Sequence, residues 1–415
     1  MRKAPASREG SVNNTTGRGR AMSHKAAQTG VSFALPHPAL LHASMLLSGF
    51  GTVFLGPVLP ALAASTHTSD SGSGLFFTAQ FIGAFLGGIT TSRHLWRSLL
   101  LGSCGAALGF LLLAISVGQQ ASLNWHLAAL LPLGFGVGQM LTSTNLLAAH
   151  RYVSHRGAAL ALVNLSWSLG AVSAPLVLDH LLATSKLAHV LLGVACLMGM
   201  IFTGAALNAR FGDRELGESA QAGSSNTVLT KNAFAYFGAL LLLYGGVETS
   251  LSGWVTTFST RYGDGRAHVL AVGTAALWVG ITAGRAGTPV VLRRMRENSL
   301  LVSSLALAAL LTILLSLSRG SVVIAVLCGL LGLSLASWFP LVLSAMLAEG
   351  AAAGQVGTII ALSGIGAATI PLLVGIASRM ADSLRIALVV PFTGLLCLLT
   401  MSLVRSSRLV ATAPE

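Results

Sequence analysis

Two ionisable residues, Glu248 and Arg285, lie deep inside long apolar runs of the sequence. If such runs cross a membrane, a charge at the bilayer centre costs about 2.5–3.5 kcal/mol on insertion scales, so it is usually kept for a function. A carboxyl group in a partly dry site can take up and release a proton, because desolvation favours its neutral form. We therefore predict proton coupling through Glu248. The structural alternative is an ion pair or hydrogen bond that only joins two helices.

Polar and aromatic residues accompany this pair at helical spacing. Thr274, Trp278, Thr282 and Arg285 follow one another at steps of four, four and three residues, which places them on one helix face. We expect this face to line a cavity. The same rule groups candidates in two other runs, Asn164 with Trp167 and Gln139 with Ser143.

The composition limits the class of protein. The 415-residue chain is 53% apolar and 9% charged, against about 25% charged in an ordinary soluble domain, which argues against a soluble enzyme. Its 47 glycines and mean hydropathy of +0.77 are typical of a polytopic helical membrane protein, because glycine lets spanning helices approach closely. At about 20 residues per crossing, the chain is long enough for a dozen helices.

The net charge of +13 does not indicate nucleic-acid binding, because Lys and Arg occur in short clusters between apolar runs. Placing both termini in the cytoplasm gives the inner loops and C-terminus twice as many Lys and Arg residues as the outer loops, as the positive-inside rule requires. We therefore expect a multi-pass protein of the cell (inner) membrane, surrounded by lipid. Its four cysteines lack metal-ligand spacing and are expected to be packing residues.

Twelve apolar runs define the predicted organisation. A disordered cytoplasmic tail (1–37) precedes six spans (38–208), a polar linker (209–231), six further spans (232–405) and a second tail (406–415). The spans are expected at 39–63, 73–91, 98–118, 126–148, 158–182, 188–208, 232–258, 268–290, 299–317, 321–347, 357–378 and 384–404.

The two sets of six runs repeat each other. Gly170 in LGAVSAPL matches Gly366 in IGAATIPL at an offset of 196 residues, and Gly83 matches Gly280 at 197. Two matches at nearly one offset indicate an internal duplication. We therefore predict an all-α membrane protein whose twelve transmembrane helices form two pseudo-symmetric six-helix bundles, with the solute site between them.

At this point the chain resembles the major facilitator superfamily, over about residues 38–405. Four stretches are similar to the fucose:proton symporter family: GFGTVFLGPVLPAL (49–62), YGGVETSLSGW (244–254), LWVGITAGR (277–285) and WFP (338–340). The resemblance implies the major facilitator fold and sugar:proton symport, and it places an Asn near Asn145. The loop GITTSRHLWR (88–97) departs from the superfamily pattern, since Ser92 replaces an acid. Arg285 could instead belong to a degenerate second copy of this loop motif. The family's acids in the first and fourth helices are also missing, so proton coupling does not follow from the resemblance.

Sugars combine apolar faces with a rim of hydroxyl groups, so their sites pair aromatic rings with fixed polar partners. We expect solute binding by the following ten residues: Gln80, Gln139, Asn145, Asn164, Trp167, Tyr244, Glu248, Trp278, Arg285 and Trp338. The predicted function is transport of a sugar or similar small polar solute by alternating access in a monomer, coupled to protons. A drug or metabolite efflux antiporter and a transporter-derived membrane sensor are the alternatives. The sequence contains no GxxxxGKS/T phosphate loop, HExxH metal pair or GxSG string, so we expect neither an enzyme nor a bound cofactor.

Overall fold

The computed structural model describes residues 37–91, 94–152, 155–209, 228–264 and 272–411. All regular elements in these ranges are α-helices, as predicted. The predicted N-terminal tail and most of the predicted linker, 210–227, lie outside the described residues. The last helix continues to Ala411, so the start of the predicted C-terminal tail is helical.

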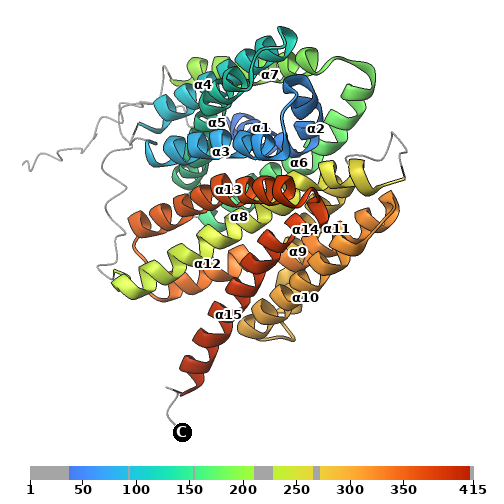
Figure 1. The fold of residues 1–415 in the computed structure, drawn as a ribbon. Coiled ribbons are helices and arrows are strands. Elements are labelled where there is room, and N and C mark those ends of the chain that lie inside the picture. Colours follow the sequence, from blue (N-terminus) through green and yellow to red (C-terminus); the bar gives the residue numbers. More distant parts are fainter. Residues whose placement is uncertain (1–36, 92–93, 153–154, 210–227, 265–271, 412–415) are drawn as a thin grey trace, which may run out of the picture. The chain divides into compact units, whose positions relative to one another are not determined.

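Seven helices form the first group, which lies in the upper half of Figure 1. They are α1 (Pro38–Val53), α2 (Leu55–Thr66), α3 (Asp70–Ile89), α4 (Leu95–Gly118), α5 (Leu123–Arg151), α6 (Arg156–Thr184) and α7 (Leu187–Ala209). Eight helices form the second group below it. They are α8 (Lys231–Tyr262), α9 (Val272–Val291), α10 (Glu297–Leu317), α11 (Ser321–Leu335), α12 (Trp338–Ala348), α13 (Ala353–Ala381), α14 (Leu384–Ala387) and α15 (Val389–Ala411).

Prolines explain two of the three additional breaks, those between α1 and α2 and between α11 and α12. α1 and α2 meet at an angle of 46° around Phe54. Pro57 has no N–H to donate to the carbonyl of Val53, so the helical ladder is interrupted at the bend. The break between α11 and α12 precedes Pro340 in the same way. Each broken pair corresponds to one predicted span.

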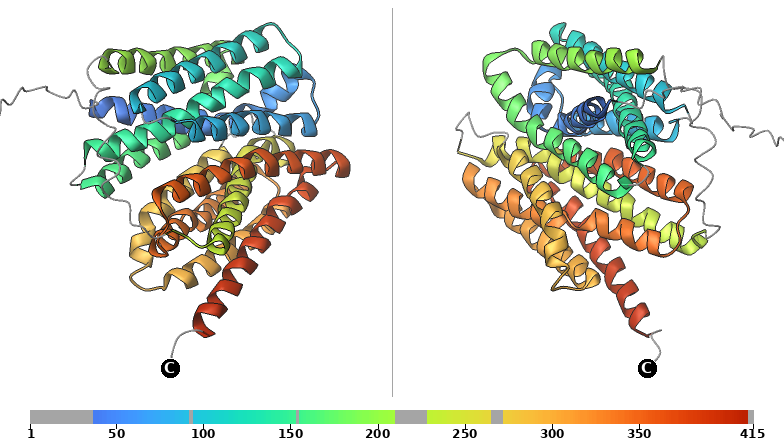
Figure 2. Two further views of the ribbon diagram at one scale, coloured as in Figure 1. Left: turned by 90° about the vertical axis from the view of Figure 1, so that its left-hand side faces the viewer. Right: turned by 180° about the vertical axis from the view of Figure 1, so that it is seen from behind.

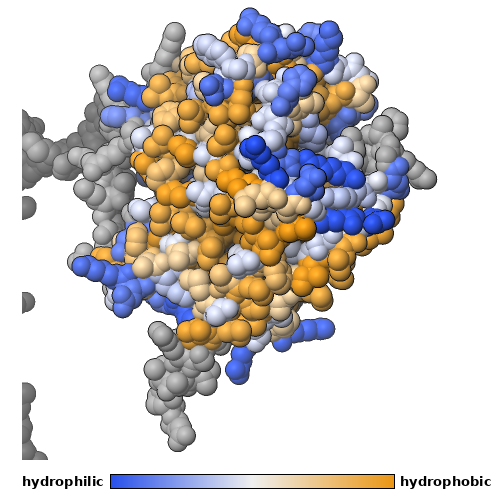
Figure 3. Space-filling view, in the orientation of Figure 1, coloured by the Kyte–Doolittle hydropathy of each residue, from blue (hydrophilic) through white to orange (hydrophobic). Residues whose placement is uncertain are grey.

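Among the described residues, ten segments are long and apolar enough to cross a membrane, or eleven if the bent α1–α2 pair is one span. The remaining predicted span is the eighth, 268–290, which forms helix α9 but is less apolar than the others. Its polar face, with Thr274, Thr282 and Arg285, lowers its hydropathy. Hydrophobic residues cover much of the face seen in Figure 3, and hydrophilic residues gather at its top, at its lower left and in a patch that runs from near the centre to the right.

Equivalent helices in the two groups pack in equivalent pairs. α1 packs on α6, α3 on α5, and α4 on both α5 and α7. In the second group α8 packs on α13, α9 on α11, and α10 on both α11 and α15. The packing order therefore repeats between the two groups.

Glycines show the same repeat at atomic level. A Cβ atom on Gly170 of α6 would lie 1.9 Å from the carbonyl oxygen of Leu46 in α1, and one on Gly366 of α13 would lie 1.8 Å from that of Leu242 in α8. Both members of each contact are 196 positions apart from their counterparts. Only glycine permits such backbone contact. The internal duplication predicted from sequence is thus present in the packing.

The two groups meet along two seams. α3 lies against α13, as Figure 1 shows, and α6 lies against α9. The right-hand view of Figure 2, seen from behind, shows α6 lying along the second group. α2 also packs on α8. Because α3 corresponds to α9 and α13 to α6, the two seams are equivalent by the repeat.

Candidate functional site

An ion pair lies where α8 and α9 face the first group of helices. The Nη2 atom of Arg285 is 3.7 Å from Oε1 of Glu248, and the side chains are 29% and 16% exposed. This distance exceeds that of a direct hydrogen bond, so the pair is loose. The Nε atom of Arg285 is buried and lacks a hydrogen-bond partner in the structure. The two deep charges predicted from sequence are therefore neighbours, and the guanidinium keeps one donor for another ligand.

Two tryptophans join this pair to the first group. The rings of Trp167 in α6 and Trp278 in α9 meet edge to face, with centroids 5.6 Å apart. The guanidinium carbon of Arg285 lies 6.0 Å from the ring centre of Trp167, within cation–π range. Gly49 of α1 makes room for this arrangement, since a Cβ there would lie 2.0 Å from the carbonyl oxygen of Trp167.

The indole nitrogens of Trp167 and Trp278 are buried and unpartnered. A buried donor without an acceptor costs roughly 1–3 kcal/mol, so such groups call for an explanation. Together with Nε of Arg285 they form three unpartnered donors beside one carboxylate. Such a set can bind a solute that brings several acceptor oxygens.

The predicted polar face of α9 is only partly directed toward this site. Thr274 is fully buried, and its hydroxyl group lies 2.8 Å from that of Thr256 in α8. The hydroxyl of Thr282 donates to the carbonyl of Trp278 in its own helix. The expectation that all four residues line a cavity is therefore wrong for Thr274, which is fully buried and pairs with Thr256; Thr282 is partly buried and bonds the backbone of its own helix.

Tyr244 and Trp338 form a stack beside the ion pair, since the Tyr244 hydroxyl also interacts with the side chains of Glu248 and Arg285. Their ring centroids are 4.5 Å apart with an angle of 11°, and the residues are 2% and 0% exposed. The Tyr244 hydroxyl donates to the carbonyl of Leu335 at 3.0 Å, just before the break between α11 and α12. In this conformation the two rings are buried against the broken helix, and the indole nitrogen of Trp338, like those of Trp167 and Trp278, has no hydrogen-bond partner.

The predicted amide residues divide between two places. Gln80 is 1% exposed, and its amide nitrogen donates to the carbonyls of Gly51 and Thr52, which fixes α3 to α1 just before the bend. Gln139 is 3% exposed, and its Cβ faces Gly102 of α4. Both residues thus pack between helices of the first group, although their Oε1 atoms have no hydrogen-bond partner.

Asn145 and Asn164 come together across α5 and α6. The amide nitrogen of Asn164 donates to Oδ1 of Asn145 at 3.1 Å, and Asn164 is exposed. Within the run 126–148, helical spacing directs Asn145 away from Gln139 and Ser143. Asn145 is paired because its partner, Asn164, comes from the neighbouring helix α6.

An ion pair that sequence reasoning missed joins the two groups. Arg261 at the end of α8 binds Asp70 at the start of α3 through both guanidinium nitrogens, one of them at 2.7 Å. The residues are 191 positions apart, and both lie at span ends, where charged residues are ordinary. The only sequence signal was an acidic residue just before the predicted span 73–91. In the part of the chain that the structure describes, no cluster of three or more His, Cys, Asp or Glu residues could hold a metal ion.

A family model described as Major Facilitator Superfamily matches residues 41–371. The chain belongs to the Major Facilitator Superfamily. The protein is therefore a multi-pass membrane protein and a secondary transporter, not an enzyme. Of the loop motif expected in this superfamily, Ser92 and Arg93 lie outside the described residues.

Solved structures of similar fold cover nearly all of this Major Facilitator transporter. A fucose:proton symporter from E. coli is 15% identical with a TM-score of 0.57, over 89% of this chain and 98% of that one. A symporter structure described as FucP in the outward conformation is 18% identical with a TM-score of 0.58, over 89% and 98%. A bacterial homologue of the human lysosomal transporter Spinster, inward-facing and unoccupied, is 14% identical with a TM-score of 0.65, over 94% and 99%. At these identities the likeness concerns the fold. No curated protein matches the chain.

Proposed function

We propose that this transporter moves a sugar or similar small polar solute across the cell membrane, coupled to protons that Glu248 takes up and releases. The observation that carries the proposal is the loose Glu248–Arg285 pair beside Trp167 and Trp278, with three buried donors that lack partners. Solute hydroxyl oxygens can accept from the two indole N–H groups and the guanidinium. The tryptophan rings offer surfaces for the apolar side of a sugar.

Coupling follows from competition for Arg285. While Glu248 is ionised, its charge attracts the guanidinium at 3.7 Å. Protonation of Glu248 removes that attraction, so Arg285 becomes free to bind solute oxygens. Proton binding to Glu248 therefore favours solute binding to Arg285, and the reverse. When the site opens to the other side, Glu248 releases the proton and Arg285 releases the solute.

One structure of similar fold is that of a fucose:proton symporter, which agrees with a sugar-like solute and a proton. We further infer that the groups at 38–208 and 232–405 act as the two moving halves of a monomer. Both termini are proposed to lie in the cytoplasm, as the charge distribution between loops predicts.

The decisive experiment replaces Glu248 with Gln, which keeps the shape and the hydrogen bonding but cannot titrate. In proteoliposomes, Glu248→Gln should abolish solute accumulation driven by a pH gradient, while counterflow exchange and binding remain. Glu297→Gln, which changes an exposed acid in the first turn of α10, is the control and should transport like the unmodified protein. A thermal-shift screen with hexoses, pentoses, deoxysugars and drugs would supply the solute, because a ligand stabilises the state that binds it.

Other results would select the alternatives. Full pH-driven accumulation in Glu248→Gln would exclude this acid from coupling. Extrusion of amphipathic compounds, with no sugar uptake, would favour an efflux antiporter. Solute binding without any flux in liposomes would favour a membrane sensor.

A further inference from the structure

We propose that Asp70, Arg261 and Ser378 form an interhelical latch, which holds the two helix groups together at one end and so gates access to the transport path. Asp70 belongs to the first group, whereas Arg261 and Ser378 belong to α8 and α13 of the second. The proposal concerns the change of access and holds for any solute, so it does not depend on sugar specificity or on Glu248.

The latch has good hydrogen-bond geometry. Arg261 donates to both carboxylate oxygens of Asp70, with Nη1 to Oδ2 at 2.7 Å. The hydroxyl of Ser378 donates to the same Oδ2 atom at 2.5 Å. Beside them, Nη1 of Arg379 donates to the hydroxyl of Ser71 at 3.2 Å. Bidentate, charge-assisted contacts of this kind are among the strongest polar interactions in proteins.

The surroundings strengthen the latch. The Asp70 side chain is 15% exposed and that of Arg261 is 39% exposed, so solvent screens the pair mainly from the arginine side. Asp70 also occupies the first turn of α3, where the helix dipole favours a negative charge. Asp382 adds a second negative charge near Arg261. The helix dipole thus favours the charge of Asp70, and Asp382 favours that of Arg261.

Close backbone packing continues from the latch along the α3–α13 seam. A Cβ on Gly375 would lie 2.3 Å from the carbonyl oxygen of Asp70, and one on Gly74 would lie 2.8 Å from Cα of Leu372. Further along, the hydroxyl of Thr78 donates to the carbonyl of Ala368 at 2.7 Å. Alternating access requires these surfaces to separate. The glycine contacts of this seam are apolar, and the Thr78 hydroxyl makes one hydrogen bond across it. The latch therefore supplies most of the polar attraction between α3 and the second group at these contacts.

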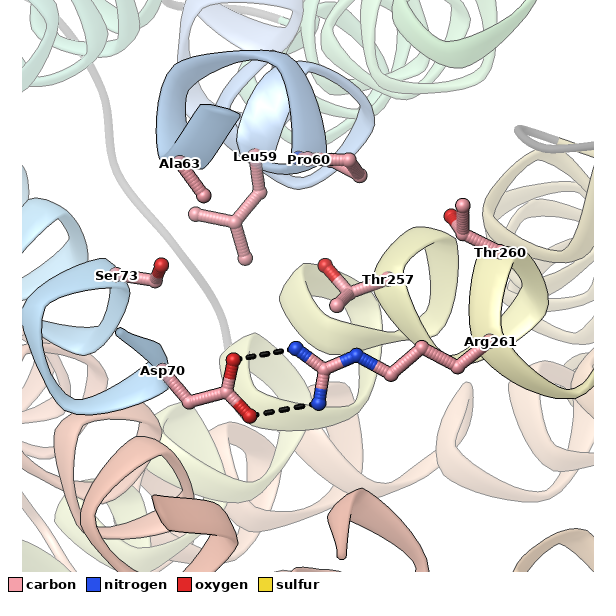
Figure 4. A pocket seen from close by; sticks show the side chains of 8 residues that line it. All are labelled: Leu59, Pro60, Ala63, Asp70, Ser73, Thr257, Thr260 and Arg261. Atoms are coloured by element: carbon pink, nitrogen blue, oxygen red, sulfur yellow. Dashed lines mark hydrogen bonds and ion pairs between the residues drawn. The ribbon is translucent and has the colours of Figure 1, made fainter. Parts of the chain in front are cut away.

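A cavity of about 170 Å³ lies against the latch and is lined by residues of both groups. Figure 4 shows Asp70 and Arg261 forming one wall, with α2 residues above them. The other lining residues are Leu59, Pro60, Ala63, Ser73, Thr257 and Thr260. Because its walls belong to both groups, opening the latch would widen this cavity.

Thr257 is the best position for a reporter of opening. It lines the cavity, is 8% exposed, and its hydroxyl has no partner in the structure. Replacing the exposed Cys104, Cys196 and Cys397 with Ser leaves Cys328, which is fully buried, as an internal measure of folding. Thr257→Cys in this background places one reporter thiol beside the latch.

The test measures the rate at which a small charged thiol reagent labels purified protein. Asp70→Asn and Arg261→Gln should each increase labelling of the introduced thiol by about tenfold or more, because each removes the charge-assisted pair. The double variant should be labelled no faster than either single variant, since both remove the same interaction. Arg261→Lys should be intermediate. Arg319→Gln, which changes an exposed basic residue between α10 and α11, should have no effect.

Three results would overturn the latch. Unchanged labelling in both single variants would show that the ion pair does not hold the groups together. Additive effects in the double variant would show that Asp70 and Arg261 act separately. Faster labelling of Cys328 in parallel with the reporter thiol would mean that the variants lose their fold rather than open at this end.

Discussion

Gly170 of α6 packs directly on the backbone of α1, and adding one methyl group there should destabilise the protein. The added Cβ would lie 1.9 Å from the carbonyl oxygen of Leu46, whereas real Cβ contacts are not closer than 3.0 Å. The two helices must therefore separate by about 1.1 Å. Backbone atoms cannot rotate away as a side chain can. Overpacking of this kind typically costs about 1–3 kcal/mol.

The matched control is Gly193 of α7, where an added Cβ would meet nothing within 4 Å. Glycine is less favourable than alanine inside a helix by about 0.8–1 kcal/mol, and this gain applies to both substitutions. Gly193→Ala should therefore leave stability unchanged or improve it. Gly170→Ala should lower it, because the cost of separating the helices is larger. Thermal denaturation of the purified proteins in one detergent measures the difference.

The repeat provides a second test of the same reasoning. Gly366→Ala places a Cβ 1.8 Å from the carbonyl oxygen of Leu242, so it should destabilise the second group as Gly170→Ala does the first. If Gly170→Ala melts at the same temperature as Gly193→Ala, the contact between α1 and α6 is looser than described, and the argument from close backbone packing fails.

Two further predictions concern the site and the orientation. Trp278→Leu keeps an apolar side chain but removes the indole N–H donor and the ring that contacts Trp167, so solute affinity should fall markedly at unchanged expression. Unaltered binding would assign Trp278 to packing. Ser224→Cys, in the predicted inner linker and outside the described residues, should react with an impermeant reagent only when the inner face is accessible, and labelling from intact cells would reverse the orientation.

The sequence was sufficient to predict the helices and their repeat. Apolar length fixes where a chain can cross a membrane, and small residues at one offset show where helices approach. Both are local properties that can be read along one chain. The ion pair of Glu248 and Arg285 is the structural alternative that the sequence analysis left open, and it lowers the cost of two deep charges.

Partner choice was harder to predict, because it depends on which neighbouring helix a face meets. Thr274 shares a face with Arg285, yet it binds Thr256, since α8 crosses α9 at that level. Tyr244 shares a helix with Glu248 but stacks on a tryptophan of α12. Helical spacing identifies residues on one face, but it does not identify what packs against that face. The Asp70–Arg261 pair was missed for the same reason.

The insufficient apolarity of α9 has a consequence for biosynthesis. An Arg near the middle of a spanning helix costs about 2.5–3.5 kcal/mol when the helix leaves the translocon alone, and α9 has few long apolar residues to offset it. Its main partner α11 is made later. The two helices pack closely, since a Cβ placed on Gly332 of α11 would lie 2.1 Å from the carbonyl oxygen of Leu277. We therefore expect stable integration of α9 only after α11 has been synthesised. Replacing Arg285 with Leu would let α9 insert earlier and remove the charge on which the proposed site depends.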